Sequence, residues 1–196
     1  MASNINAAVP PFGNATTAGV RENFATAKAE IETLQRQIGF VDYNDAATGV
    51  TPIAVGVSTW VKLTNDKLGP NTKIDALPEG VTNLWNNVTN QLVLTELPVN
   101  AMVEVRADLV VTTTAANQIV KFRTLFAIGN PIQFDVEGTA NQFKTAGAQK
   151  VVLNGAFYIG SDPVRLNPAE FQLWSDAACT VRVNGWYIRI IKFLGA

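Results

Sequence analysis

The sequence contains no histidine and only one cysteine, Cys179. Without histidine, Ser-His-Asp triads, Cys-His pairs and the usual zinc ligand sets are excluded. A single cysteine cannot form a disulfide within the chain, so folding in a reducing cytoplasm fits. Because Cys179 lies beside a predicted strand, we expect a buried structural thiol. The glycines match neither nucleotide-binding pattern. The sequence therefore predicts no catalytic residue, no metal site and no cofactor.

The sequence also has little charge. Charged residues make up 16% of its 196 positions and hydrophobic residues 47%, against about 25% charged residues in an ordinary soluble domain. A surface so poor in charge indicates that partner subunits cover part of it. The net charge of −1, with scattered basic residues, argues against nucleic acid or an anionic membrane as the main partner. No apolar run approaches the ~20 residues of a membrane span.

Two further groups of residues have to be weighed as sites. Asp162, Glu170 and Asp176 are close enough in sequence to suggest a glycosidase pair, but ordinary solvated loop carboxylates are favoured. The four tryptophans, each in or beside an alternating strand, could be platforms for sugar stacking. We expect core or interface packing for them: Trp60, Trp85, Trp174 and Trp186.

Apolar residues from Thr17 onward recur at spacings that alternate between four and three: Val20, Phe24, Ala27, Ile31, Leu34 and Ile38. This spacing is the seam of a coiled coil, and one helix cannot bury so narrow a stripe alone. Gly39 can end such a helix. We therefore predict a helix over residues 17–39 that associates with copies of itself. The alternative is an amphipathic helix packed on its own β domain.

The segments on either side of this helix have different characters. Residues 1–16 are predicted to be an extended arm, in which Pro10 and Pro11 hold the backbone open and Phe12 offers one apolar side chain. Such an arm is either disordered or docked on a partner. Residues 40–52 are predicted to be a turn-rich linker. Their Asp42-Tyr-Asn44-Asp45 start lacks the central glycine and closing glutamate of a calcium loop.

From Ile53 onward the apolar period changes to two, so residues 53–196 are predicted to be a β domain. Alternating or strongly apolar runs occur at 55–63, 103–111, 120–128, 150–159, 170–174 and 179–193. Runs of this kind, separated by Gly, Pro, Asn and Asp clusters, predict an antiparallel sandwich of the jelly-roll type. The absence of long helical patterns between them excludes βαβ crossovers.

The last run carries two predictions. Asn184-Gly185 is the strongest hairpin signal in the chain and predicts a turn between 181–183 and 186–191. The final strand, WYIRIIKF, is apolar on both faces apart from Arg189 and Lys192. Such a strand is either central in its sheet or buried at a subunit contact. We predict that Trp186, Ile188 and Ile190 form one face of an oligomer contact.

Several of these blocks also resemble known families. The block PPFGNATTAGVRENFATAKAEIETLQ resembles the leading segments of tailed-bacteriophage virion proteins, where an arm precedes a short helix and a fibre or knob. Three later blocks resemble the trimeric jelly-roll knobs of phage head fibres and cement proteins, which are similar in outline to tumour-necrosis-factor and complement-C1q trimers: WVKLTND, GVTNLWNNVTNQLVLTELPVNAMVEVRADLVVTTTAANQ and NGWYIRIIKF. The resemblance implies a homotrimer with a capsid-facing arm and an outward β knob.

Together these features predict a non-catalytic structural protein on the exterior of a phage capsid, made in the cytoplasm of the bacterial host. Its partners would be copies of itself and the major capsid protein, the latter reached through Pro10, Pro11 and Phe12. The lack of a collagen-like or repeated shaft favours a short decoration over a long adhesin. Two alternatives remain: a tail-fibre or receptor-binding tip that recognises host surface glycan, and a capsule depolymerase.

Overall fold

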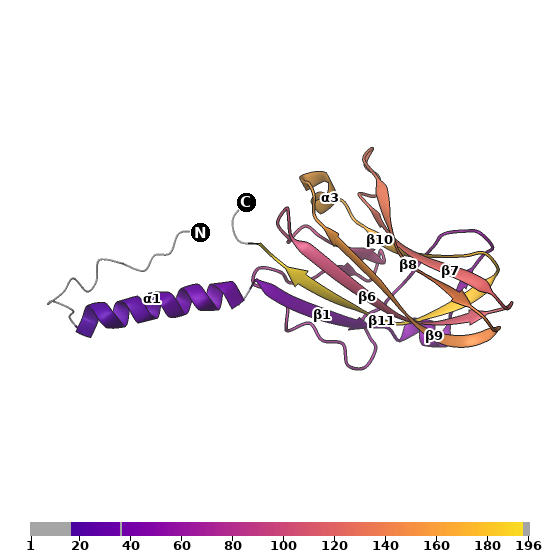
Figure 1. The fold of residues 1–196 in the computed structure, drawn as a ribbon, viewed down its shortest axis with the longest axis horizontal. Helices are drawn as coiled ribbons and strands as arrows, with labels where there is room; N and C mark the ends of the chain where they lie inside the picture. The colour runs from indigo at the N-terminus through magenta and orange to yellow at the C-terminus, as the bar shows by residue number, and fades with distance from the viewer. Residues whose placement is uncertain (1–16, 36, 194–196) are drawn as a thin grey trace.

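The computed structural model describes residues 17–35 and 37–193. It contains a β sandwich from which one long helix, α1 (Thr17–Gln35), projects (Figure 1). The predicted antiparallel sandwich is confirmed. The helix leaves the sandwich at one end and lies along neither sheet, so the two parts are architecturally separate.

The sandwich consists of two antiparallel sheets. Sheet I has the order β1-β11-β6-β9, and β2 also pairs with β11: β1 (Ile38–Asn44), β2 (Ile53–Val55), β6 (Met102–Thr113), β9 (Gly147–Tyr158) and β11 (Cys179–Ile191). Sheet II has the order β3-β10-β7-β8: β3 (Val61–Lys62), β7 (Gln118–Phe126), β8 (Phe134–Phe143) and β10 (Glu170–Ser175). Because the chain passes back and forth between the sheets, the topology is that of a jelly roll.

Four short elements complete the described chain. The strands β4 (Trp85–Asn86) and β5 (Gln91–Leu92) pair with each other. The helices α2 (Ala47–Val50) and α3 (Asp162–Leu166) occupy connections between strands. Each is too brief to add a layer to the sandwich.

Aromatic side chains from both sheets meet in the core. The Phe171 ring lies 5.5 Å from Trp85 and 5.2 Å from Trp186, measured between centroids. Phe122 lies 5.7 Å from Phe171. Offset and edge-on contacts of this kind add to the free energy gained by burying the rings. This aromatic cluster joins the two sheets, and the contact of Phe126 with Phe157, at 4.6 Å between centroids, joins them as well.

The predicted hairpin at Asn184-Gly185 is wrong. Strand β11 runs unbroken from Cys179 to Ile191, and its register against β6 shifts between Val183 and Gly185. That shift is a β-bulge, which inserts one extra residue, Asn184, without ending the strand. A Cβ on Gly185 would lie 2.8 Å from the Tyr43 carbonyl oxygen, so glycine is required by the close approach of β1 and not by a turn.

The predicted linker and helix end also need correction. Residues 38–44 form β1, which pairs with β11 from Ile38 opposite Ile191 to Asn44 opposite Gly185. Ile38 therefore belongs to the sheet and not to the helix seam. Alternate residues of β1 are buried, because Val41 and Tyr43 face the core. Only the part of the predicted linker beyond β1 connects strands.

The outer edge of β1 is covered by a loop. The amide of Phe40 donates to the carbonyl of Ala76 at 2.8 Å, and Asp42 and Lys73 exchange two backbone hydrogen bonds. Gly39 lies against this loop so closely that a Cβ would be 2.5 Å from both the Ala76 oxygen and the Pro78 nitrogen. The strand is thus held from both sides.

Replacement of Gly39 by alanine should lower the free energy of unfolding by about 1–3 kcal/mol, the usual cost of overpacking a filled site. The measurement is urea unfolding followed by tryptophan fluorescence. Gly155→Ala is the matched control, because a Cβ there would lie 3.8 Å from Phe122, an ordinary contact. Equal unfolding midpoints for the two variants would contradict the packing of the loop on β1.

The carboxylate of Glu170 on β10 contacts side chains from two neighbouring strands, β3 and β5. Lys62 Nζ on β3 lies 2.6 Å from Glu170 Oε1, and the side-chain amides of Gln91 and Gln172 each donate to the same carboxylate at 3.1 Å. Burial alone would raise the pKa of Glu170, but these partners outweigh burial and hold its pKa below the ordinary value. The charged form is therefore favoured in the folded state.

Because the folded-state pKa of Glu170 is lowered, its contribution to stability is present above the unfolded-state pKa of about 4.3 and is lost as pH falls through the folded-state pKa. Glu170→Gln should therefore destabilise the protein more at pH 6 than at pH 3. Urea unfolding at the two pH values measures this. Equal losses at both would show that the ionised carboxylate contributes nothing.

Candidate self-association surface

The described apolar residues of the helix seam are exposed to solvent. Phe24 is 73% exposed and Ile31 54%, and Val20 and Ala27 are half-buried. The side chain of Leu34 lies outside what the structure describes. Exposed large apolar side chains of this kind are typical of interaction surfaces. The single chain leaves the seam exposed. This agrees with the expectation that one helix cannot bury so narrow a stripe alone.

The outer face of sheet I presents a second apolar feature where α1 joins it. Cross-strand pairing places Ile38, Ile191, Met102 and Tyr158 in one row across β1, β11, β6 and β9. Ile38 is 52% exposed and Tyr158 68%. We call the helix seam and this row together the stem surface. The two parts meet in the chain at Ile38.

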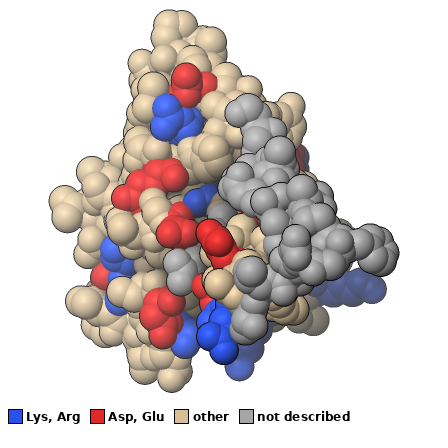
Figure 2. Space-filling view, turned by 90° about the vertical axis from the view of Figure 1, so that its left-hand side faces the viewer, with Lys and Arg blue, Asp and Glu red and all other residues tan. Residues whose placement is uncertain are grey.

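Figure 2 shows the molecule from this α1 end. Acidic and basic side chains lie interspersed on the visible face, and most of that face carries neither charge. This agrees with the low charged fraction of the sequence. The described residues visible at this end therefore form no field of one sign that would repel a second copy of the molecule.

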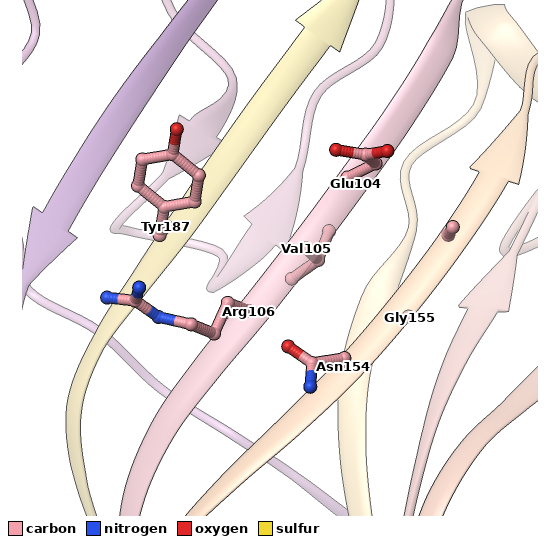
Figure 3. A pocket seen from close by; sticks show the side chains of 7 residues that line it. Glu104, Val105, Arg106, Asn154, Gly155 and Tyr187 are labelled. Carbon is pink, nitrogen blue, oxygen red and sulfur yellow. The ribbon is translucent and has the colours of Figure 1, made fainter.

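The centre of the same outer face contains a hollow of about 440 Å³, the central hollow, between β6, β9 and β11 (Figure 3). Glu104, Arg106, Asn154 and Tyr187 surround it. Phe40 stacks on Tyr187 with 5.4 Å between ring centroids, and the Arg106 guanidinium lies 5.2 Å from the same ring.

The charges around the central hollow are already paired within the chain. Arg106 contacts Asp108 at 2.9 Å, and Arg189 contacts Glu104 at 3.2 Å. Burial raises the pKa of the neighbouring Asp42 carboxyl, and Asp108 raises it further against the opposing effect of Arg106. Paired charges can be covered at a smaller desolvation cost than isolated ones. This face can therefore be covered by another subunit without leaving a charge alone.

The free edge of the sandwich, where β8 and β9 lie side by side, forms a third apolar area. Both faces of β8 are exposed along most of its length. We call the exposed apolar residues here the edge surface: Ile132, Phe134, Val136 and Val152. Phe134 is partly held by Phe126, whose ring centroid lies 5.1 Å away.

The predicted oligomer contact through Trp186, Ile188 and Ile190 is wrong. All three side chains have no exposed surface in the single chain, because they face sheet II inside the sandwich. A side chain without accessible surface cannot touch another subunit. The apolar character of the last strand correctly indicated that these side chains are buried. They are buried in the core of one protomer and not between subunits.

The residues weighed for other chemistry are engaged structurally. Asp162 pairs with Arg165 at 2.9 Å, and Asp176 accepts a hydrogen bond from the Ile119 amide at 2.9 Å. Glu170 is the first residue of β10 and Asp176 follows its last residue, so their backbones are about 20 Å apart at 3.3 Å per residue, too far for a glycosidase pair. Cys179 is buried as predicted, and burial raises the pKa of its thiol.

Two of the four tryptophans are packed in the core, as predicted. Each of the other two has a cation over its ring. Trp85 and Trp186 have no exposed surface. The Arg123 guanidinium lies 4.2 Å from the centroid of Trp60, and Lys121 Nζ lies 5.2 Å from Trp174. A ring with a cation across one face is a poorer platform for sugar stacking.

The structure describes residues 17–35 and 37–193. Within these residues, no group of three or more acidic or cysteine side chains is placed to hold a metal ion. No helix among them is long and apolar enough to cross a bilayer. Pro10, Pro11 and Phe12, predicted to dock on a capsid, lie outside them.

No protein-family model and no curated protein sequence matches this chain. Among solved structures it is similar to the Eiger TNF of S. frugiperda, with a TM-score of 0.47, 8% identity, and coverage of 82% of this chain and 95% of that one. It is also similar to the vertex protein P5 of PRD1, with a TM-score of 0.37, 13% identity and coverage of 80% and 96%.

A chain of the T13 IBDV viral particle matches with a TM-score of 0.40 and 9% identity, over 79% of this chain and 31% of that one. Because these TM-scores lie below 0.5, the likenesses carry no argument about what the protein does.

Proposed function

We propose that the protein is a non-catalytic structural protein of a bacteriophage virion, a homotrimer that decorates or stabilises the capsid as a cement protein or short head fibre. The virion assignment comes from the family resemblance of the N-terminal block and the strand blocks. The trimer assignment combines that resemblance with the exposed stem surface.

The observation that carries the proposal is the exposed seam on α1. A projecting helix whose Phe24 and Ile31 stand in water gains stability when copies of it bury those side chains against one another, at about 25 cal/mol per Å² of apolar area. The paired charges around the central hollow allow the neighbouring sheet face to be covered as well. Both features favour self-association at the α1 end.

The consequence for function follows from where the arms start. Residues 1–16 precede α1, so a bundle of three helices brings three arms to one end of the assembly. Three weak contacts with separate capsid sites then act as one strong attachment, because each first contact raises the effective concentration of the others. The β sandwiches occupy the opposite end and face outward.

Ile31→Asp should weaken self-association, because it places a charge in the seam. Sedimentation velocity at micromolar concentration should show trimers for the wild type and a shift toward smaller species for the variant. Ala25→Asp is the matched control, since Ala25 is exposed on α1 and lies outside the seam. The control should sediment as the wild type does.

Two outcomes of that experiment would contradict the proposal. A wild type that is a stable monomer at micromolar concentration would overturn the proposed trimer. An Ile31→Asp variant that sediments as the wild type would show that the seam is not the contact. In that case Val136→Asp, a charge in the edge surface, tests whether the free edge carries the association instead.

Removal of residues 1–16 should leave a folded trimer that no longer joins capsids. The assay mixes purified protein with capsids that lack it and measures co-sedimentation. The full chain is expected to co-sediment, and the truncated chain is expected to stay in the supernatant and to sediment alone as a trimer of its own lower mass. Full binding by the truncated chain would show that the β domain carries the attachment.

A further inference from the structure

The outer face of sheet I has a second hollow, the far hollow, at the end away from α1. Its volume is about 450 Å³, and it lies where β1, β6, β9 and β11 meet the loop around Asn71. Arg182 and Ile191 are nine residues apart on β11, so the far hollow is about 30 Å from the stem surface at 3.3 Å per residue. It stays accessible when the stem surface is covered.

Two cations face this hollow. Arg182 on β11 and Lys150 on β9 are both register partners of Val110 on β6, so they flank Val110 on the same face of the sheet. Their backbones are two strand spacings, about 10 Å, apart. Long side chains from these positions can reach one small ligand between them.

These cations differ from the other basic residues of the β domain. Within residues 37–193, the other basic side chains contact a carboxylate, a carbonyl or an aromatic ring, with the exception of Lys144. Lys150 and Arg182 have no such partner among the described residues. Most basic side chains of the described domain thus have a partner, whereas these two lie without one at the same hollow.

Asp45, the carboxylate that lines the far hollow, is engaged elsewhere. Its Oδ2 accepts hydrogen bonds from the amide and hydroxyl of Thr48 at 2.7 and 2.6 Å, and its Oδ1 accepts from the Asp66 amide at 2.8 Å. One carboxylate with both oxygens occupied does not neutralise two cations. The hollow therefore favours an anionic ligand.

The β-bulge supplies the hollow with a polar side chain. The extra residue of β11, Asn184, lines the hollow beside Arg182. Thr48 holds the bulge in place, because its hydroxyl oxygen accepts a hydrogen bond from the Val183 amide at 2.8 Å while the hydroxyl hydrogen is donated to Asp45. Bulges commonly redirect a side chain beside a binding site.

A second amide lines the hollow from the opposite side. Asn71, in the loop after β3, has a φ of 71°. The side-chain amides of Asn71 and Asn184 make no hydrogen bond within the described residues. Each offers one donor group and one acceptor, which suits neighbouring hydroxyl groups.

We propose that the far hollow binds an acidic saccharide, with Arg182 and Lys150 on its carboxylate groups and Asn71 and Asn184 on its hydroxyls. Arginine pairs with a carboxylate through two parallel hydrogen bonds, and lysine acts as a point charge. The volume is that of an ordinary small-ligand site. This inference stands whether or not the protein decorates a capsid.

The lining disfavours other partners. A protein partner needs an apolar pocket for an aromatic or aliphatic anchor, but here the apolar contribution is limited to Val110 and Pro70. A nucleic acid needs a larger basic surface than two side chains on a chain of net charge −1. A short ligand that combines carboxylates and hydroxyls matches both the charges and the amides.

The test is titration calorimetry of the full chain with a galacturonic acid trisaccharide at low salt. Its methyl ester, which has the same hydroxyls and no charge, is the ligand control. The acidic form should bind, and the ester should bind at least tenfold more weakly. Arg182→Ala and Lys150→Ala should each weaken binding about tenfold, and Asn184→Ala several-fold.

Lys144→Ala is the matched protein control, because it removes another cation without a partner from outside the hollow, and it should bind as the wild type does. Arg182→Gln serves in place of Arg182→Ala if the alanine variant unfolds at lower temperature.

The proposal is overturned if the wild type does not bind the acidic trisaccharide at millimolar concentration. It is also overturned if the Lys150→Ala/Arg182→Ala double variant binds normally, or if inorganic phosphate binds as tightly as the saccharide. Sedimentation of the double variant should match the wild type, which separates this test from that of self-association.

Discussion

The pairing of β1 with β11 is the interaction on which the remaining arrangement depends. β11 is the strand that sheet I is built around, because β1 and β2 pair along one side of it and β6 along the other. Since β1 follows α1 almost directly in the chain, its seven-residue ladder with β11 fixes where the helix leaves the sandwich. The loop held by Gly39 then covers the outer edge of β1 and keeps that edge from pairing with another strand.

The outer face of sheet I is divided in its polarity along the strands. At the α1 end it is a row of apolar side chains, in the centre it carries charges that are paired within the chain, and at the far end it has two cations without partners. The first two regions can be covered by another copy without leaving a charge unpaired, which costs less desolvation than covering isolated charges would. The third gains from an anionic ligand. One face can therefore serve an assembly and a ligand without competition between them.

The fold was largely predictable from the sequence, and the errors have identifiable causes. The long strands β6 and β7 alternate apolar and polar residues because one face of each is buried. β1 was missed because Ile38 continues the helix spacing, which hid the period-two burial of Val41 and Tyr43. β8 has no clear alternation because both of its faces are exposed. Gly185 signals a turn when only local sequence is considered, whereas the contact that requires it comes from Tyr43.

The surfaces were less predictable than the fold. Phe24 and Ile31 could be identified from the sequence, because the alternating spacing of the apolar residues places them on one side of a helix. Periodicity could not separate a face buried inside the protomer from one buried between subunits, which is why Trp186, Ile188 and Ile190 were assigned to the wrong contact. The far hollow left no local signal, because Asn71, Lys150 and Arg182 come from distant parts of the chain and meet only through strand register.

The short connection between α1 and β1 has a mechanical consequence. In Figure 1 the helix and the strand point in nearly the same direction, and β1 begins at Ile38, soon after α1 ends at Gln35. A pull on the N-terminal end of the helix therefore acts along β1. The hydrogen bonds of an antiparallel ladder lie across the strands, so such a load shears all seven residue pairs with β11 together and does not peel them apart one by one.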